Sequence, residues 1–167
     1  KRLGQARDGA ERARAAQMQA KVSDAMARGR DLAQRGLWDQ AVLAFQEAVG
    51  AQEDNAEAQE ALASAERAKV DVEVNLLVAK CAQRMRDRDW DAAKECVARL
   101  LVLRPSHPEF VERGAEIDRL ERRDACSAAL LSARQAMDVS DWLPAEEFLE
   151  RARAADPDSA EVRALLL

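Results

Sequence analysis

The sequence predicts an all-α protein made of three repeated units, in which long helices alternate with short ones. Two observations lead to this fold class. The 167 residues include only six Gly and four Pro and are rich in Ala, Leu, Glu and Arg, which favours helix nearly everywhere. The three Trp residues are evenly spaced, since 90 − 38 = 52 and 142 − 90 = 52. A regular period of this kind is typical of stacked helical or strand units, and the composition selects helices.

A short helix is expected to begin near each Trp. Three residues after each Trp stands an Ala, and four residues further on stands a larger apolar residue. This spacing places both positions on one face of a helix. The small residues are Ala41, Ala93 and Ala145, and the larger ones are Phe45, Val97 and Leu149. We expect this face to pack inside the protein, together with Trp38, Trp90 and Trp142.

A longer helix is expected to follow each short one. Sixteen residues after each Trp stands an Asp or Ser, followed three residues later by a Glu, which is the capping-box pattern of a helix start. The three pairs are Asp54 with Glu57, Ser106 with Glu109, and Asp158 with Glu161. Pro105 and Pro157 precede two of these pairs and cannot continue the helix before them.

The half of each unit that contains the Trp resembles the tetratricopeptide repeat family. The stretches GLWDQAVLAFQEAVGAQEDN, RDWDAAKECVARLLVLRPSH and SDWLPAEEFLERARAADPDS look like the second helix of such a repeat, with its A-x3-F core and closing Pro. Gly29, Cys81 and Ala133, nine residues before each Trp, match the small residue that these repeats place where their two helices touch. The resemblance implies a right-handed α-α superhelix, or solenoid.

The repeat is longer than that of the family. The usual period is about 34 residues, and the remaining 52 − 34 = 18 residues make about five helical turns, which keeps the same face pointing inward. We therefore expect a first helix of roughly 30 residues, about 45 Å long, in each unit. A three-helix unit is the alternative. The expected organisation is one domain, 1–167, with units at about 2–53, 54–105 and 106–157 and the start of a further helix at 158–167.

One stretch favours a strand when it is considered alone. In KVDVEVN, from Lys69 to Asn75, three Val residues alternate with charged residues. The corresponding stretch one period later, ERRDACS, has a helical composition, and neither stretch contains Gly or Pro. We therefore expect helix here, with a kink as the alternative.

The composition argues against catalysis and against a metal or cofactor site. The chain has one His, His107, at an expected helix start, and no CxxC or HExxH spacing. The recurring Asp and Ser positions are interpreted as helix caps. Cys81, Cys96 and Cys126 occupy apolar positions of the repeat, which favours free thiols that act as small hydrophobic side chains in a reducing compartment.

Charge and hydropathy exclude two further classes of partner. The formal net charge is −5, and the Arg clusters are interleaved with Asp and Glu, so we expect no nucleic-acid binding. No apolar run approaches the ~18 residues of a membrane span, so no membrane partner is expected within this chain. Because the chain opens on Lys1 rather than Met, we expect a fragment of a longer protein, located in the cytoplasm.

Protein recognition is the function that these patterns favour. In the family that the sequence resembles, the first helix of each pair lines a concave groove, and counting back from each Trp gives the corresponding residues. Arg30 and Arg134 occupy the same position two repeats apart, where they would hold carboxylates of an acidic peptide, and the apolar residues suit an amphipathic helix. The predicted partner-binding residues are Met26, Arg30, Val78, Met85, Arg86, Leu130, Arg134 and Met137.

Two alternative functions remain at the level of sequence. The chain is a structural spacer or a self-assembling scaffold, in which copies stack end to end. Alternatively, it is a regulatory domain that recruits a substrate for a larger bacterial signalling protein.

Overall fold

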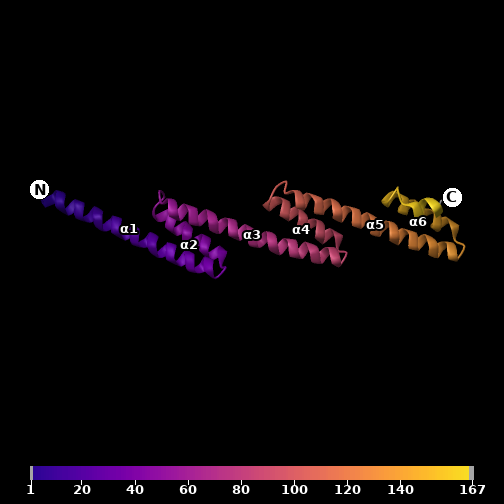
Figure 1. Ribbon diagram of the computed structural model, residues 1–167, viewed down its shortest axis with the longest axis horizontal. Coiled ribbons are helices and arrows are strands. Elements are labelled where there is room, and N and C mark those ends of the chain that lie inside the picture. The colour runs from indigo at the N-terminus through magenta and orange to yellow at the C-terminus, as the bar shows by residue number, and fades with distance from the viewer. Residues whose placement is uncertain (1, 166–167) are drawn as a thin grey trace. The chain divides into compact units, whose positions relative to one another are not determined.

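The computed structural model describes the backbone of residues 2–165 and the side chains of residues 9–165. This part of the chain contains seven α-helices and no strand, which confirms the all-α class (Figure 1). The helices are α1 (Arg2–Gln34), α2 (Trp38–Ala51), α3 (Ala56–Arg86), α4 (Trp90–Leu103), α5 (Pro108–Asp138), α6 (Trp142–Ala155) and α7 (Ala160–Leu165).

Long and short helices alternate with the period of the sequence. The long helices α1, α3 and α5 have 33, 31 and 31 residues, and the short helices α2, α4 and α6 have 14 residues each. The long helices end at Gln34, Arg86 and Asp138, which are 52 residues apart. A long first helix and a short second helix in each sequence repeat are therefore confirmed, and the three-helix alternative is not observed in the described residues.

The stretch with alternating Val residues is part of one uninterrupted helix, α3. Val74 is buried and Val70 is half-buried, whereas Val72 is exposed. Residues four apart share a face of a helix and the residue between them points away, so this burial pattern follows the helical period.

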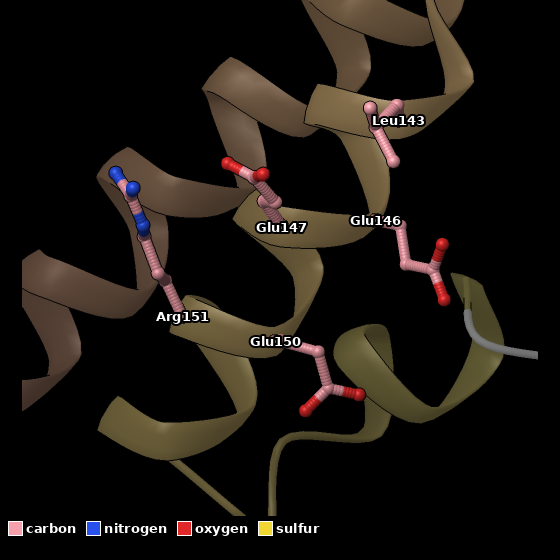
Figure 2. Close-up of a pocket in the computed structure, with 5 residues that line it drawn as sticks. All are labelled: Leu143, Glu146, Glu147, Glu150 and Arg151. Carbon is pink, nitrogen blue, oxygen red and sulfur yellow. The ribbon is translucent and has the colours of Figure 1, made fainter.

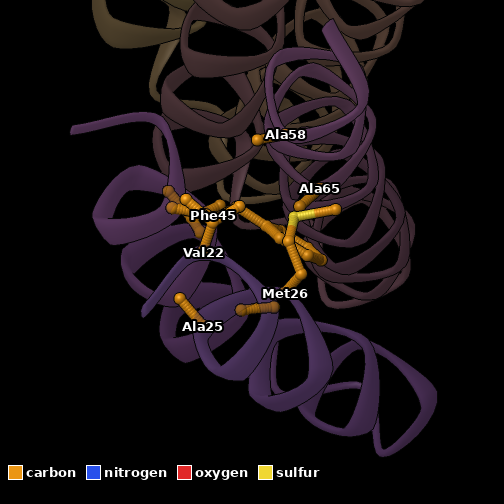
Figure 3. Close-up of a cluster of buried hydrophobic side chains, with 9 residues drawn as sticks. Val22, Ala25, Met26, Phe45, Ala58 and Ala65 are labelled. Carbon is orange, nitrogen blue, oxygen red and sulfur yellow. The ribbon is translucent and has the colours of Figure 1, made fainter. Parts of the chain in front are cut away.

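Contacts divide the chain into two compact units, Lys1–Asn75 (unit 1) and Leu76–Leu167 (unit 2), and α3 contributes to both. In unit 1, α2 lies beside α1 and the first part of α3 (Figure 1). One cluster of buried side chains joins the three helices, with Val22 and Met26 from α1, Phe45 from α2 and Ala58 from α3 (Figure 3). Residues 9–21 of α1 precede this cluster and are all exposed.

Unit 2 contains two buried clusters, each of which joins three helices. The first brings Cys81 of α3 together with residues of α4 and with Ile117 of α5. The second joins Cys126 and Leu130 of α5 to α6 and to Val162 of α7. A long helix therefore packs on two short helices, with its first part on the preceding one and its second part on the following one.

Each long helix touches the next short helix through a small residue. Gly29, Cys81 and Ala133 are all buried, as expected for the positions where two helices meet. A β-carbon built on Gly29 would overlap the ring of Phe45, so glycine is the residue that fits without a shift of this ring. Phe45 is replaced by the smaller Val97 and Leu149 in the repeats that have Cys and Ala. In these two repeats the side chain on the long helix is larger than in the first repeat, and the side chain opposite it on the short helix is smaller.

A left-handed residue ends each long helix. Gly36, Arg88 and Ser140 have φ angles of 73°, 57° and 60° and are 52 residues apart. In the first of these turns the N–H of Gly36 donates to the carbonyl of Ala33, and the N–H of Leu37 donates to that of Leu32. The other two turns have the same pair of hydrogen bonds. Each turn satisfies carbonyls at the helix end and redirects the chain into the short helix.

The expected capping boxes are wrong by one residue. The helices α3, α5 and α7 begin after Asn55, His107 and Ser159 rather than after Asp54, Ser106 and Asp158. The side chain of Asn55 accepts from the N–H of Ala58 at 3.0 Å, and Ser159 accepts from Val162 at 3.4 Å. The Glu residues of the pattern therefore stand one position too early in their helices to return to the cap.

The expectation that all three Trp residues are packed inside is also wrong. Trp38 and Trp90 are half-buried, but 63% of Trp142 is exposed. Trp38 packs against the unit 1 cluster and Trp90 against the first cluster of unit 2. The residues of α6 that pack in the second cluster of unit 2 lie further along the helix, at Phe148, Leu149 and Ala152.

The Gly29 contact predicts an unusual response to alanine. Gly29→Ala should destabilise the protein by about 1 kcal/mol. Overpacking against Phe45 costs about 1–3 kcal/mol, and the higher helix propensity of Ala offsets about 1 kcal/mol of this cost. The free energy of unfolding measured in urea gives this value.

Two variants serve as controls for this prediction. Gly114→Ala should stabilise the protein by up to about 1 kcal/mol, because its β-carbon would meet Val97 at an ordinary 3.5 Å. Adding Phe45→Leu to Gly29→Ala reproduces the pair Ala133 and Leu149 of the third repeat. The double variant should be more stable, by about 1 kcal/mol, than the sum of the two single effects predicts. Additive effects would show that the two residues are not in contact.

The left-handed turns predict opposite effects at equivalent positions. Gly36→Ala should destabilise by about 1 kcal/mol, because a β-carbon is unfavourable at this φ although nothing lies within 4 Å of it. Ser140→Gly should stabilise by about 0.5–1 kcal/mol, because it removes the same strain. Urea unfolding of both variants tests the pair, and changes of the same sign would contradict it.

Candidate partner-binding surfaces

The structure distributes the eight predicted partner-binding residues over both units and over different degrees of burial. Met26 and Leu130 are each only 5% exposed and belong to the buried clusters, so they are core residues and cannot contact a partner in this structure (Figure 3 shows Met26). Val78, Met85 and Met137 are half-buried, and Met85 packs against the cluster that contains Cys81.

The three arginines of the predicted set are exposed, but two of them already hold a carboxylate. Arg30 forms an ion pair with Glu57 of α3, and Arg134 forms the equivalent ion pair with Glu161 of α7. Both pairs are well exposed to solvent, and each joins a long helix to the helix that begins the next repeat. The recurrence of Arg at this position is therefore explained by the fold, and Glu57 and Glu161 serve this contact rather than a capping box.

A second set of ion pairs joins α2 to α3 and α4 to α5. In unit 1, Lys69 Nζ lies 2.6 Å from Oδ1 of Asp39, and this hydrogen bond raises the pKa of Lys69. In unit 2, Lys94 pairs with Glu121, and with Asp118 at 3.3 Å; the hydrogen bond with Glu121 raises the pKa of Lys94. Lys69 and Glu121 are one period apart, but their partners are not, since Asp39 corresponds to Asp91 and Lys94 to Val42. The two repeats therefore make this helix contact with opposite charges at different positions of the short helix.

Unit 1 has an open hollow of about 300 Å³ between its three helices. We call this site the unit 1 hollow. Its apolar lining includes the half-buried Trp38 and the buried Phe45, while Arg30, Gln34 and Ser64 supply polar groups. The remaining lining residues are Ala33, Ala61 and Ala65. The hollow has the mixture of an apolar floor and a few polar groups that is typical of binding sites.

Unit 2 has an exposed apolar patch where α5 turns into α6. Val139, Trp142 and Leu143, which we call the α6 patch, are 74%, 63% and 72% exposed. Clusters of exposed apolar side chains are typical of interaction surfaces. Repeats one and two have Arg35 and Asp87 in place of Val139, and Asp39 and Asp91 in place of Leu143. The third repeat has therefore replaced polar residues by apolar ones at two exposed positions.

Acidic side chains border the α6 patch. A shallow depression next to it is lined by Leu143, Glu146, Glu147, Glu150 and Arg151. Figure 2 shows that Glu146 and Glu150 project to one side of α6, and Glu147 and Arg151 to the other. Arg151 lies over the ring of Phe148, 5.4 Å from its centre. Sequence reasoning missed this patch because the Trp residues were treated as equivalent, although comparison of the three repeats at positions 139 and 143 would have revealed it.

The described thiols are buried and unpaired. Cys81, Cys96 and Cys126 form no disulfide and are each less than 5% exposed, as expected for free thiols in apolar positions. Burial raises the pKa of Cys81 and of Cys126 above the ordinary value of a thiol. Such thiols are poor nucleophiles, because the thiolate is the reactive form.

His107 is the one histidine of the sequence. His107 is half-buried and its ring stacks on Phe110 with the ring centres 4.4 Å apart, so it packs rather than standing free in a turn. Among the described residues, no three or more His, Cys, Asp or Glu side chains gather in a way that would hold a metal ion. None of the described helices combines the length and the apolar character required to cross a membrane.

Comparisons of the chain with protein-family models, with curated proteins and with solved structures gave no match. The resemblance to tetratricopeptide repeats therefore depends on the residues of this sequence.

The raised thiol pKa values predict how stability depends on pH. The folded protein holds the protons of Cys81 and Cys126 to higher pH than the unfolded chain does. These thiols therefore contribute stability that is complete below the pKa of an unfolded thiol and is lost as the pH rises through the folded pKa. The free energy of unfolding should fall above about pH 9, as measured in urea under reducing conditions.

The variant Cys81→Ala is a matched control, since the third repeat has Ala at this position. Its stability should fall less steeply with pH than that of the original chain. An identical slope for both proteins would show that Cys81 does not contribute to the pH dependence.

Proposed function

We propose that this chain is a non-catalytic protein–protein interaction module that binds an amphipathic helix or peptide of a partner. The observation that carries the proposal is the unit 1 hollow, whose lining combines apolar residues, among them the half-buried Trp38, with Arg30. An apolar hollow of this kind can take up a large apolar side chain from a partner, and such anchors supply most of the binding energy at protein interfaces.

Arg30 gives the proposed site a preference for acidic partners. Its ion pair with Glu57 is exposed on both sides, and exposed pairs contribute only about 0–1 kcal/mol. A partner carboxylate therefore replaces Glu57 at little cost, and the guanidinium holds it with paired hydrogen bonds. The proposed ligand is a helix or peptide with a large apolar residue next to an acidic one.

We also propose an architecture and a cellular location for the chain. Helix pairs with a regular period and small residues at each helix contact support an array of extended tetratricopeptide-like units that stack as a right-handed superhelix. Three buried, unpaired thiols support a reducing compartment such as the cytoplasm.

The proposal predicts that filling the hollow abolishes binding. Peptides selected from a displayed random library for binding to the chain should carry an apolar residue beside Asp or Glu. Ser64→Phe places an aromatic ring at the lining of the hollow and should weaken these peptides by at least about tenfold in a fluorescence-anisotropy titration.

Ala63→Phe is the matched control, because Ala63 is an exposed neighbour on α3 that does not line the hollow. This variant should bind the peptides as the original does. Thermal unfolding of both variants should confirm that they are folded. If no peptide is selected, or if the selected peptides tolerate Ser64→Phe, the hollow is not the binding site.

A further inference from the structure

The unit 1 hollow lies where the other two repeats carry large side chains. Ala33 of α1 and Ala61 of α3 both line the hollow. The corresponding residues, one and two periods later, are Met85 and Met137 for Ala33, and Arg113 and Leu165 for Ala61. Only the first of the three repeats therefore has Ala at both positions, and its hollow coincides with the side chains that it lacks.

In unit 2 the larger side chains pack between helices. Met85 packs against the buried cluster that contains Cys81, and Leu165 packs against the cluster that contains Cys126. The side chain of Arg113 is 25% exposed, and its Nε atom is buried. Burial raises the pKa of the Cys81 thiol and the nearby charge of Arg113 opposes this, which places Arg113 close to the helix contact. These side chains occupy positions that correspond to the unit 1 hollow.

Another difference between the repeats is balanced inside unit 1. Ala65, which also lines the hollow, corresponds to the larger Ile117, whereas Phe45 corresponds to the smaller Val97. Ala65 and Phe45 belong to one buried cluster, and Ile117 and Val97 belong to the corresponding cluster of unit 2. The ring of Phe45 therefore makes up for the missing Ile side chain, and this pair does not account for the hollow.

The third repeat combines the same ion pair with large aliphatic residues. Arg134 pairs with Glu161 as Arg30 pairs with Glu57, and the two pairs are separated by exactly two periods. In the third repeat the positions of the two alanines carry Met and Leu, and both side chains are half-buried. The charged groups are thus the same in the first repeat, but the aliphatic groups are missing.

We propose that a partner supplies the missing group, so that the anchor in the unit 1 hollow is an aliphatic side chain, Leu or Met, rather than an aromatic ring. This inference rests on the proposed function and specifies its ligand. The chain itself uses aliphatic side chains or the methylene stem of Arg at these positions, and flexible chains fit irregular gaps. Charge complementarity selects the rest of the ligand, because Arg30 offers its guanidinium to a carboxylate next to the anchor.

A peptide series measures the preferred anchor. The probe is the tightest peptide selected from the displayed library, and its anchor is the apolar residue whose replacement by Ala weakens binding most. Four versions of this peptide carry Leu, Met, Phe or Trp at the anchor. In fluorescence-anisotropy titrations with the full chain, the better of the Leu and Met versions should bind at least about tenfold more tightly than either aromatic version.

The partner carboxylate is tested in a cycle with Arg30. Replacing the acidic residue of the peptide by its amide should weaken binding to the original chain by about tenfold. The same replacement should have little effect on binding to Arg30→Gln, because this variant has no guanidinium to pair with the carboxylate.

A variant that fills the hollow tests the inference from the side of the chain. Ala33→Met with Ala61→Leu gives unit 1 the residues of the third repeat. This double variant should raise the urea midpoint of unfolding, because it fills empty space, and should weaken the peptide by at least about tenfold. Ala27→Met with Ala63→Leu is the matched control, since both residues are exposed on the same two helices and do not line the hollow. The control should leave binding and the midpoint unchanged.

The outcomes separate this inference from the proposed function. If peptides bind and are blocked by Ser64→Phe but prefer a Phe or Trp anchor, the inference is wrong and the proposed function stands. Undiminished binding to the filled variant has the same meaning. If circular dichroism shows that the filled variant is unfolded, the peptide series alone decides. If no peptide is selected, or if Ser64→Phe is tolerated, the proposed function fails and the inference fails with it.

Discussion

The close contact between each long helix and the short helix after it is the constraint on which the rest of the structure depends. Phe45 can join the side chains of α1 and α3 only because Gly29 leaves room for its ring. The other repeats solve the same problem with different sizes, pairing Cys81 with Val97 and Ala133 with Leu149. Since overpacking and underpacking both cost stability, each change on one helix restricts the other.

The alternation of helices could be predicted from the sequence because the Trp period fixes where every short helix begins. The starts of the long helices were less certain for a physical reason. A Glu three residues after Asp or Ser fits a capping box, but the same Glu57 and Glu161 side chains reach Arg30 and Arg134, which lie 27 residues earlier. Sequence spacing identifies only a nearby partner, here the helix cap. The distant arginine comes close to the Glu only in the folded structure.

The surfaces were harder to predict than the helices. A long helix that packs on two short ones has apolar residues on more than one face, so Met26 and Leu130 could not be assigned to a groove or to the core from their spacing. Trp142 is exposed although its sequence motif matches those of the half-buried Trp38 and Trp90. Arg30 was found because it recurs two repeats later, whereas Val139 and Leu143 were missed because they differ from their counterparts.

The continuity of α3 also determines how the two units respond when the protein unfolds. The helix belongs to unit 1 up to Asn75 and to unit 2 from Leu76, with no loop at the division. If one unit melts, half of α3 loses the side chains that cover it, and an uncovered helix of about 10–20 residues is marginal in water. The end of the other half then frays as well. The two units are thereby coupled in their unfolding by the backbone itself.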